Sequence, residues 1–441
     1  MKFTIYIIIM LLALLGASCS AIYESPDECP PPDGSGDVLI SFRMITPVTE
    51  VASRADDHGH DEVGSEYRRF EDGLDMSDVA LFIFAGMADS TDEARLLLKV
   101  TDLSAASQPS DIEVLGIPGS YIVNLTIPQT QLQTFLGREI DANSYEEVFF
   151  RVLMVANSSA GTSGDASQWD AITATTFPDV ISQLDNLPTF PMSLLCNFNC
   201  DYSIPTDYGD NTVSGFYPGS RTCMPMFGTI ETRLSQQILL NSTPLHRAML
   251  PDMDMLRSLA KVRLIDNIDN KGADGYPKVV AAQLVGTQNA IHQLPFGAAT
   301  YVNGNQVHSP YFADPDYDSA SGPGFIYCLG RMPASITDVP SSQRKGDVRV
   351  GYVPEMKILP TLNENLGGLP AFRITMALSK SVDGTEITEE YLVPMSRFPG
   401  FGGNILRNHI YTLSVDHVTL QNLTLNITVN HWDTIRFIYE Y

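Results

Sequence analysis

The sequence predicts an all-β protein built from sandwiches of short strands, with a few short helices. Segments in which apolar and polar residues alternate recur along the chain, as expected of half-buried strands. The 28 prolines and 32 glycines are spread throughout and supply turns between such segments. Long segments with the 3.6-residue period of a helix are almost absent, and only residues 169–187 favour a helix, which is expected to be short.

Length and charge restrict the domain organisation and the classes of partner. A chain of 441 residues is too long for one ordinary hydrophobic core, so two domains are expected. Its apolar fraction of 44% is sufficient for globular packing. The net charge of −25, from 52 acidic and 27 basic residues, would repel phosphates and argues against binding to nucleic acid.

The first eighteen residues have the features of a targeting segment. Lys2 is a minimal basic region, and residues 5–15 form an apolar stretch too short to span a bilayer. The segment ends in Gly-Ala-Ser before Cys19, which resembles the lipobox of bacterial lipoproteins. That resemblance implies cleavage before Cys19 and acylation of the cysteine, which would hold the protein on a membrane. The alternative is an ordinary signal peptide followed by a chance cysteine.

Strands are expected in order after a tether. Residues 19–36 contain four prolines and several small residues, which is typical of a linker. Strands of the first half are predicted at residues 38–44, 78–86, 96–103, 121–127 and 148–156. A second block begins near residue 229, with strands predicted at residues 253–268, 278–285, 349–353, 371–379, 390–394 and 410–415.

The C-terminal residues alternate most regularly. Leu423, Leu425, Ile427 and Val429 alternate with polar residues, and a second alternating set follows after residue 433, namely Ile435, Phe437, Tyr439 and Tyr441. Chain ends usually fray and carry little apolar surface. These two apolar faces must therefore be buried, either in the protein's own sheet or in a neighbour's.

The candidate metal ligands and cysteines lie mostly in segments that read as loops. His58 and His60, and the series Asp314, Asp316 and Asp318, are interpreted as solvated loops, since Ser319 and Phe325 break the calcium-loop pattern. No metal or other cofactor is expected. With Cys19 acylated, five cysteines remain, and a disulfide among Cys196, Cys200 and Cys223 is plausible in an exported protein.

Catalytic motifs are absent from the sequence. It contains no G-x-S-x-G, no H-E-x-x-H and no glycine-rich phosphate loop. A carboxylate pair of the glycosidase kind stays open as an alternative, because spatial neighbours are invisible in a sequence. We expect a protein that is not an enzyme.

Three segments of the second half carry a family resemblance. They are residues 224–228 (MPMFG), 257–262 (RSLAKV) and 407–411 (RNHIY). Together with the lipobox they resemble the Bacteroidales fimbrillin family, the FimA- and Mfa-like subunits of type V pili. The resemblance covers residues 37–441 and is strongest after residue 224. The matching signature residues are Pro225, Met226, Gly228, Arg257, Ala260, Lys261, Arg407, Asn408, His409 and Tyr411.

Each signature segment also has a simple structural interpretation. Residues 257–262 would form a strand that buries Leu259 and shows Lys261 to solvent. Asn408 and His409 would lead into a strand whose Tyr411 packs in the core. Both interpretations agree with the family, in which these segments are structural.

The resemblance implies two tandem β-sandwich domains of the Greek-key or transthyretin-like kind, at residues 37–228 and 229–441. It implies export as an outer-membrane lipoprotein and assembly with other fimbrial subunits at the cell surface. It also implies that an arginine-specific protease removes the first strand, residues 38–44, and that a neighbour's strand replaces it. Arg54 is the favoured cleavage site and Arg69 is a second candidate. The donated strand would carry Ile435, Phe437, Tyr439 and Tyr441, with residues 423–429 staying in the home sandwich.

Two other functions stay open. The protein would be an anchor or minor accessory subunit if it kept its lipid and its first strand. It would be a tip adhesin, or a surface lipoprotein for a host protein or glycan, if residues 202–217 or 303–324 form a binding site.

Overall fold

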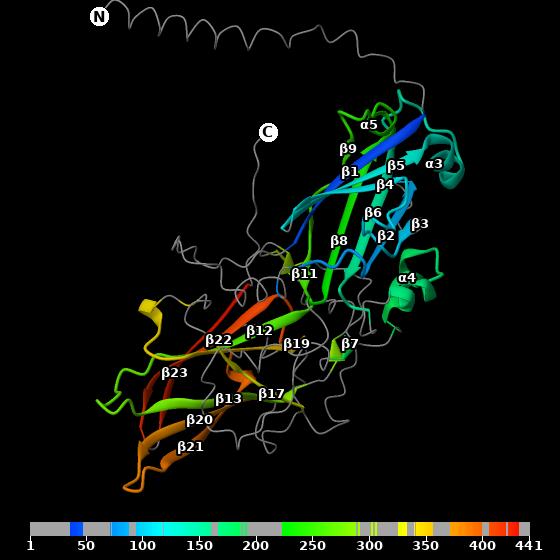
Figure 1. Ribbon diagram of the computed structural model, residues 1–441. Coiled ribbons are helices and arrows are strands. Elements are labelled where there is room, and N and C mark those ends of the chain that lie inside the picture. Colours follow the sequence, from blue (N-terminus) through cyan, green and yellow to red (C-terminus); the bar gives the residue numbers. More distant parts are fainter. Residues whose placement is uncertain are drawn as a thin grey trace, which may run out of the picture.

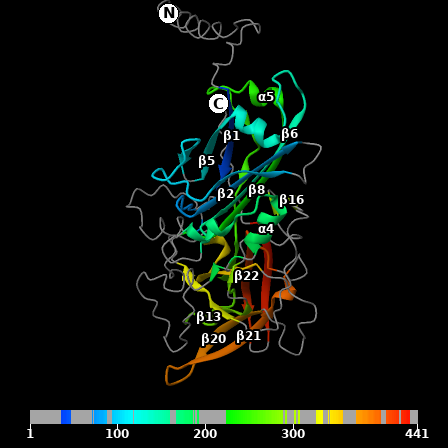
Figure 2. The same ribbon diagram turned by 90° about the vertical axis from the view of Figure 1, so that its right-hand side faces the viewer.

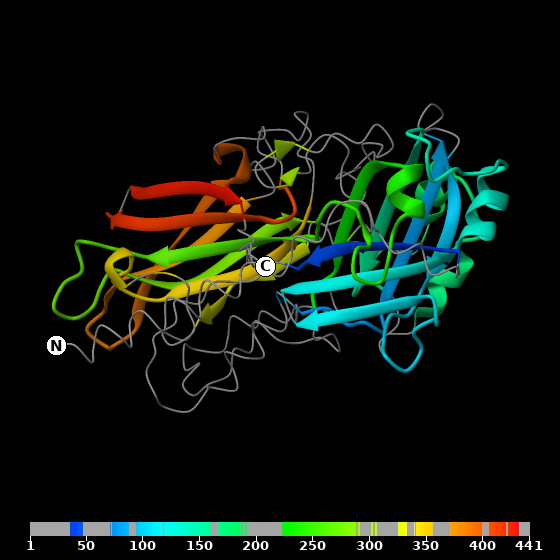
Figure 3. The ribbon, with the colours of Figure 1, turned by 90° about the horizontal axis from the view of Figure 1, so that it is seen from above.

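The computed structural model confirms the all-β sandwich fold class. It describes residues 36–46, 71, 73–87, 94–117, 119–159, 166–185, 187, 190–191, 223–287, 290–291, 301–302, 305–306, 325–332, 339, 341–355, 371–398, 405–419 and 422–431. These residues form two pairs of facing sheets that lie end to end (Figure 1). The side view and the view from above show the same division (Figures 2 and 3).

One sheet of the first pair contains the strand nearest the N-terminus. Its order is β10-β1-β5-β4, and β9 also pairs with β1. The bounds are β1 Asp37–Ile45, β4 Ile112–Ile117, β5 Ser120–Pro128, β9 Ala248–Met249 and β10 Met253–Asp254.

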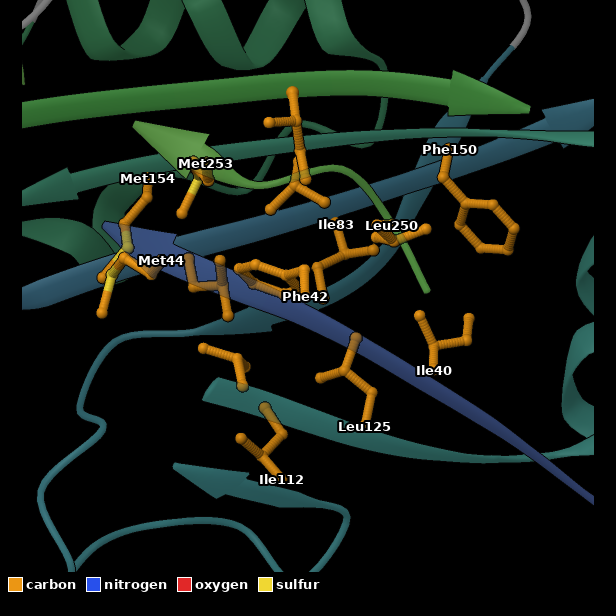
Figure 4. Packing of buried hydrophobic residues seen from close by; sticks show 14 of the residues in the cluster. Ile40, Phe42, Met44, Ile83, Ile112, Leu125, Phe150, Met154, Leu250 and Met253 are labelled. Atoms are coloured by element: carbon orange, nitrogen blue, oxygen red, sulfur yellow. The ribbon is translucent and has the colours of Figure 1, made fainter. Parts of the chain in front are cut away.

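The facing sheet of the first pair is antiparallel throughout, in the order β11-β8-β6-β2-β3. The bounds are β2 Val79–Met87, β3 Arg95–Val100, β6 Glu147–Ala156, β8 Met226–Ser235 and β11 Leu256–Arg257. Alternate residues of the two sheets meet in one core, where Phe42 of β1 lies near Ile83 and Leu125 (Figure 4).

Helices cover the outer face of the sheet β11-β8-β6-β2-β3 and the end of the first pair of sheets that lies away from the second pair. Trp169 and the α4 residues Phe177 and Val180 pack on the outward residues of β2 and β6. The Thr176 hydroxyl accepts a hydrogen bond from the Asp179 N–H and caps α4 at its start. The helices are α3 Gln129–Leu136, α4 Phe177–Asp185 and α5 Gln236–Leu240, and the 3-10 turns are η2 Ala166–Ala171, η4 Ser341–Gln343 and η6 Met395–Arg397.

The second pair of sheets follows the same plan. One sheet has the order β18-β19-β12-β22-β23, and the facing sheet has the order β17-β13-β20-β21. Bounds in the first are β12 Leu259–Asp266, β18 Gly330–Met332, β19 Val348–Pro354, β22 His409–Val418 and β23 Leu423–His431. Bounds in the second are β13 Lys278–Thr287, β17 Phe325–Cys328, β20 Ala371–Lys380 and β21 Glu386–Pro394. Two small sheets pair β7 Phe190–Pro191 with β14 Ala290–Ile291, and β15 Tyr301–Val302 with β16 Asn305–Gln306.

The chain passes from the first pair of sheets to the second at Ser258. Arg257 is the last residue of β11 in the first pair, and Leu259 is the first residue of β12 in the second. The domain boundary expected between residues 228 and 229 falls inside β8. The strand β8 contains this boundary and β9, β10 and β11 follow it, yet all four are hydrogen-bonded to strands of the first pair of sheets.

Most predicted strands are present, and two kinds of difference remain. The segment 253–268 is three strands, because the ladder breaks at Met255 and again where the chain changes sheets at Ser258. The strands β4 and β8 and the helices α3 and α5 were not predicted from the sequence. The helix expected within residues 169–187 is present as α4, preceded by η2.

Several predicted features lie outside the described residues. They include the lipidation site Cys19, the processing candidates Arg54 and Arg69, and the donor residues Ile435, Phe437, Tyr439 and Tyr441. The candidate metal ligands of residues 58–60 and 314–318 and the loops 202–217 and 303–324 also lie there, apart from the short strand β16. Among the described helices, none is both long enough and apolar enough to cross a membrane.

Candidate functional site

The strand β1 lies between two very different neighbours. On one side all nine of its residues pair with β5 in an antiparallel ladder from Asp37 to Ile45. On the other side it meets only two short parallel strands, β9 beside Ile40 and Ser41, and β10 beside Met44 and Ile45. One long ladder therefore holds β1, together with two separate contacts on its other edge.

The inward face of β1 is part of the first core. Val38, Ile40, Phe42 and Met44 are each 0% exposed. They pack with residues of β2, β5 and β6 and with Leu250 and Met253 (Figure 4). Because these four positions alternate along the strand, β1 supplies a continuous row of the core.

The outward face of β1 makes specific polar contacts. The Ser41 hydroxyl donates to Asn124 Oδ1 at 2.8 Å, and Asn124 Nδ2 donates to Glu113 Oε2 at 2.9 Å. Arg43 forms an ion pair with Asp252, with both side chains about one-third exposed. The outward face thus combines a buried hydroxyl at position 41 with a solvated cation at position 43.

Backbone contacts fix both ends of β1 and the gap between β9 and β10. The Gln129 N–H donates to the Gly36 carbonyl at 2.6 Å, and the Gly119 N–H donates to the Thr46 hydroxyl at 3.0 Å. In the gap, the Leu250 N–H reaches the Ser41 carbonyl at 2.8 Å.

A half-buried tyrosine lies directly across from β1. Tyr121 of β5 pairs with Met44 and packs against the first core. Partial burial raises the pKa of the Tyr121 phenol, and charge on the Cys223 thiol raises the pKa further. The phenol therefore reports whether the strand beside it is in place. The possible partners of Cys223 in a disulfide, Cys196 and Cys200, lie outside the described residues.

The signature residues gather at a second place, the junction of the two sheet pairs. The Lys261 ammonium lies 3.0 Å from Glu71 Oε1, and both side chains are 0% exposed. The Tyr352 hydroxyl also donates to Glu71 Oε1, and Arg257 Nε donates to the Glu71 carbonyl at 3.0 Å. The interpretation that Lys261 faces solvent was therefore wrong, because Glu71 supplies a buried counter-charge.

A second buried ion pair lies beside the first. Arg407 Nε donates to Glu355 Oε2 at 2.7 Å, and the Arg407 guanidinium also contacts the Ser258 hydroxyl at 3.3 Å. Asn408 adopts a left-handed φ of 55° and donates its N–H to the Leu259 carbonyl at 2.8 Å. The His409 ring nitrogen Nδ1 lies 2.7 Å from the Arg407 carbonyl.

The other signature residues pack around these two pairs. Tyr411 is buried on β22, and its hydroxyl accepts from the Leu406 N–H at 2.8 Å. Its burial raises the pKa of the phenol well above the ordinary range. Met226 pairs with Arg257, and the Pro225 carbonyl accepts from the Ser258 N–H. Gly228 lets the chain pass close to β10, because a Cβ there would lie 2.5 Å from Met255 Sδ and 3.3 Å from the Asp254 carbonyl oxygen, so the Met255 side chain would have to move.

Glu71, Tyr352 and Glu355 complete the junction and were missed in the sequence. The contact from Tyr352 to Glu71 spans 281 positions of the chain, so no local spacing indicates it. We name Glu71, Lys261, Tyr352, Glu355 and Arg407 the junction cluster. Its contacts are internal, which is the arrangement expected of a structural element.

The strand β23 occupies the edge of its sheet among the described residues. It pairs with β22 from His409 to Val418, so residues 423–429 lie in the home sandwich. Leu423, Leu425, Ile427 and Val429 pack against the second core but are only partly buried, while the residues between them are exposed. The described chain ends at His431, directly before the second alternating set.

Comparisons with known proteins come from solved structures alone, since no family model and no curated protein matches the chain. A fimbrial assembly protein from Parabacteroides distasonis is 11% identical with a TM-score of 0.35, over 89% of this chain and 99% of that chain. A putative cell adhesion protein from Bacteroides eggerthii is 13% identical with a TM-score of 0.38, over 91% and 97%. A putative polysaccharide binding protein from Bacteroides thetaiotaomicron is 9% identical with a TM-score of 0.29, over 90% and 98%.

Proposed function

We propose that this chain is a structural subunit of a cell-surface fimbria, exported as a lipoprotein and polymerised by strand exchange. Processing at Arg54 or Arg69 removes β1, and the C-terminal segment of a neighbouring subunit takes its place. The observation that carries the proposal is the position of β1. It closes the first core, and its partner β5 is distant in the chain, so no hairpin turn joins the two strands. The signature segments and the descriptions of the similar solved structures, fimbrial assembly and cell adhesion, support it.

The position of β1 means that its loss costs much free energy and that a replacement must be a strand with an apolar face. Its four inward side chains are fully buried, at about 1.5–3 kcal/mol each, so their loss removes roughly 6–12 kcal/mol of gross burial. It would also leave the β5 edge without its hydrogen-bond partner along nine residues. An apolar strand from another subunit satisfies both needs at once, less the cost of ordering it.

The C-terminal segment is the candidate donor because its alternating apolar residues follow β23 along the chain. β23 pairs up to His431, and the alternating residues Ile435, Phe437, Tyr439 and Tyr441 come after that point. Ten residues follow His431, which is enough for one strand of the length of β1.

Removal of residues 433–441 tests this proposal. We expect a folded, lipid-processed precursor that forms no filaments, measured by electron microscopy of cells and by the ladder on a native gel. The control is Glu440→Gln, which changes the same segment without removing an apolar residue and should leave filaments intact. Normal filaments from the truncated chain would contradict strand donation.

The N-terminus of the surface form separates a polymer subunit from an anchor. A start at Ala55 or Phe70 is expected for a processed subunit, whereas an acylated Cys19 indicates an anchor that keeps β1. Mass spectrometry of protein released from the cell surface distinguishes them. Substitution of Arg54, Arg68 and Arg69 by Gln should block processing and polymerisation together, with Arg43→Gln as a matched control elsewhere in the N-terminal region.

A further inference from the structure

The β1 strand and the C-terminal segment share a five-residue pattern. Residues 41–45 read Ser-Phe-Arg-Met-Ile, and residues 434–438 read Thr-Ile-Arg-Phe-Ile. Each position pairs residues of one kind: a small hydroxyl residue, an apolar residue, arginine, a second apolar residue and isoleucine. The pattern covers both faces of a strand, so it specifies more than the alternation does.

Each position of this pattern has a defined environment in β1. Phe42 and Met44 are fully buried on the inward face, and Ile45 is 3% exposed on the outward face. Ser41 donates to Asn124, which a threonine hydroxyl can also do. Arg43 pairs with Asp252, and Arg436 would bring the same guanidinium to that carboxylate.

Neighbouring registers place charge in buried positions. Sliding the segment by two residues brings Arg436 to the position of Ser41 and Glu440 to the position of Ile45, both of which are buried. Sliding it by four would place Ile435, Phe437, Tyr439 and Tyr441 at the four inward positions of β1. That register also brings Arg436 to the position of Leu39 and places Glu440 beside Asp252, where like charges repel. In the favoured register the donor strand must begin at Thr434, because Asp433 would bring a carboxylate to the fully buried position of Ile40, so the positions of Val38 and Ile40 stay unfilled by this segment.

We propose that residues 434–438 of a second copy of this chain occupy the positions of residues 41–45, antiparallel to β5, with Arg436 paired to Asp252. This inference rests on the proposed strand exchange and adds its register. The donor fills the half of the groove next to the junction, where β10 and Thr46 lie. Asp252 selects this register over its neighbours through Arg436, and Asn124 adds a hydrogen bond to Thr434.

Disulfide trapping in the full-length chain reads the register directly. Asn124→Cys faces position 41, so it is combined in turn with three donor variants. Thr434→Cys reports the proposed register, Arg436→Cys reports a slide of two residues, and Ile438→Cys reports a slide of four. We expect an intermolecular ladder on a non-reducing gel from the Thr434→Cys pair, several-fold stronger than from the other two. Each single-cysteine variant is the control for the native thiols.

The outcomes separate the register from strand exchange itself. A ladder from Arg436→Cys or Ile438→Cys, or polymers without any of the three cross-links, overturns the register and leaves subunit polymerisation standing. A wild-type chain that is processed but forms no polymer overturns both. If Asn124→Cys fails to fold, Ile122→Cys with Arg436→Cys reads the same register, because Ile122 pairs with Arg43.

A charge exchange provides a second reading. Arg436→Asp should slow polymerisation about two- to five-fold at low salt, as expected for a partly exposed ion pair. Asp252→Arg in the same chain should restore the rate, whereas Asp252→Arg combined with native Arg436 should not. Equal rates for all these variants would show that Arg436 does not lie beside Asp252.

Discussion

The strands β1 and β23 look alike in sequence and differ in their surroundings. Each has nine residues and a regular row of apolar side chains. β1 lies inside its sheet with both faces largely buried, whereas β23 lies at the edge of its sheet with one face exposed and the other partly buried. The difference shows that alternation predicts a strand, but that its partners on both edges decide how much stability it supplies.

The largest test of this comparison removes one core side chain from each strand. Phe42→Ala should lower the free energy of unfolding of the first sheet pair by about 3–5 kcal/mol, because its ring is fully buried. Ile427→Ala should cost the second pair about 1–2 kcal/mol, because that side chain is only partly buried. Urea unfolding of the full-length precursor, followed by hydrogen exchange in each sheet pair, measures both. Equal losses would contradict the comparison.

The junction cluster extends the comparison to the segment after β1, because its residue Glu71 fixes that segment to Lys261 and Tyr352. Glu71→Ala leaves the Lys261 ammonium buried without its carboxylate and should cost about 3–5 kcal/mol in unfolding free energy. The double variant Glu71→Ala with Lys261→Met should recover most of this loss. Thermal unfolding of the two variants and of the exposed control Glu113→Ala decides it. An additive loss in the double variant would exclude direct coupling.

Two tyrosines report on the two strands by their ionisation. Burial raises the pKa of both Tyr121, opposite β1, and Tyr411, opposite Val429 of β23. Because an unfolded tyrosine ionises near pH 10, each should add stability below that pH that is lost as the pH rises above it. After β1 is removed, the pKa of Tyr121 should fall toward its ordinary value and that of Tyr411 should not. Ultraviolet titration of wild type against Tyr121→Phe follows this change.

The smallest effect concerns the outward face of β1. Arg43→Ala should cost at most about 1 kcal/mol in unfolding free energy, since the pair with Asp252 is partly exposed. The loss should shrink further in 1 M salt. Denaturant unfolding at two ionic strengths measures this, with Arg138→Ala as a control from a more exposed pair. A loss as large as that of Phe42→Ala would mean that the outward face holds β1.

Local patterns predicted the strands, and distant contacts decided the rest. β1 and β23 were predicted because their alternation is uninterrupted. β4 was missed because it is short and contains Gly116, whose φ of 131° breaks the pattern. Residues 253–268 appeared as one strand because the change of sheet at Ser258 has no local signal. The burial of Lys261 was missed for the same reason, since its partner Glu71 lies far away in the chain.

The gap between β9 and β10 affects how quickly β1 can leave its sheet. Pro251 lies in this gap and has no N–H, and the pairing of β1 shifts by one residue across the gap, from Ser41 with Met249 to Met44 with Met253. On this edge β1 can separate in short steps, each breaking few bonds, whereas its ladder with β5 is continuous over nine residues. An incoming strand can pair with β5 behind the departing one in the same steps. In the strand exchange proposed above, this interrupted edge would open first, while the ladder with β5 and the four buried side chains keep the equilibrium stability high.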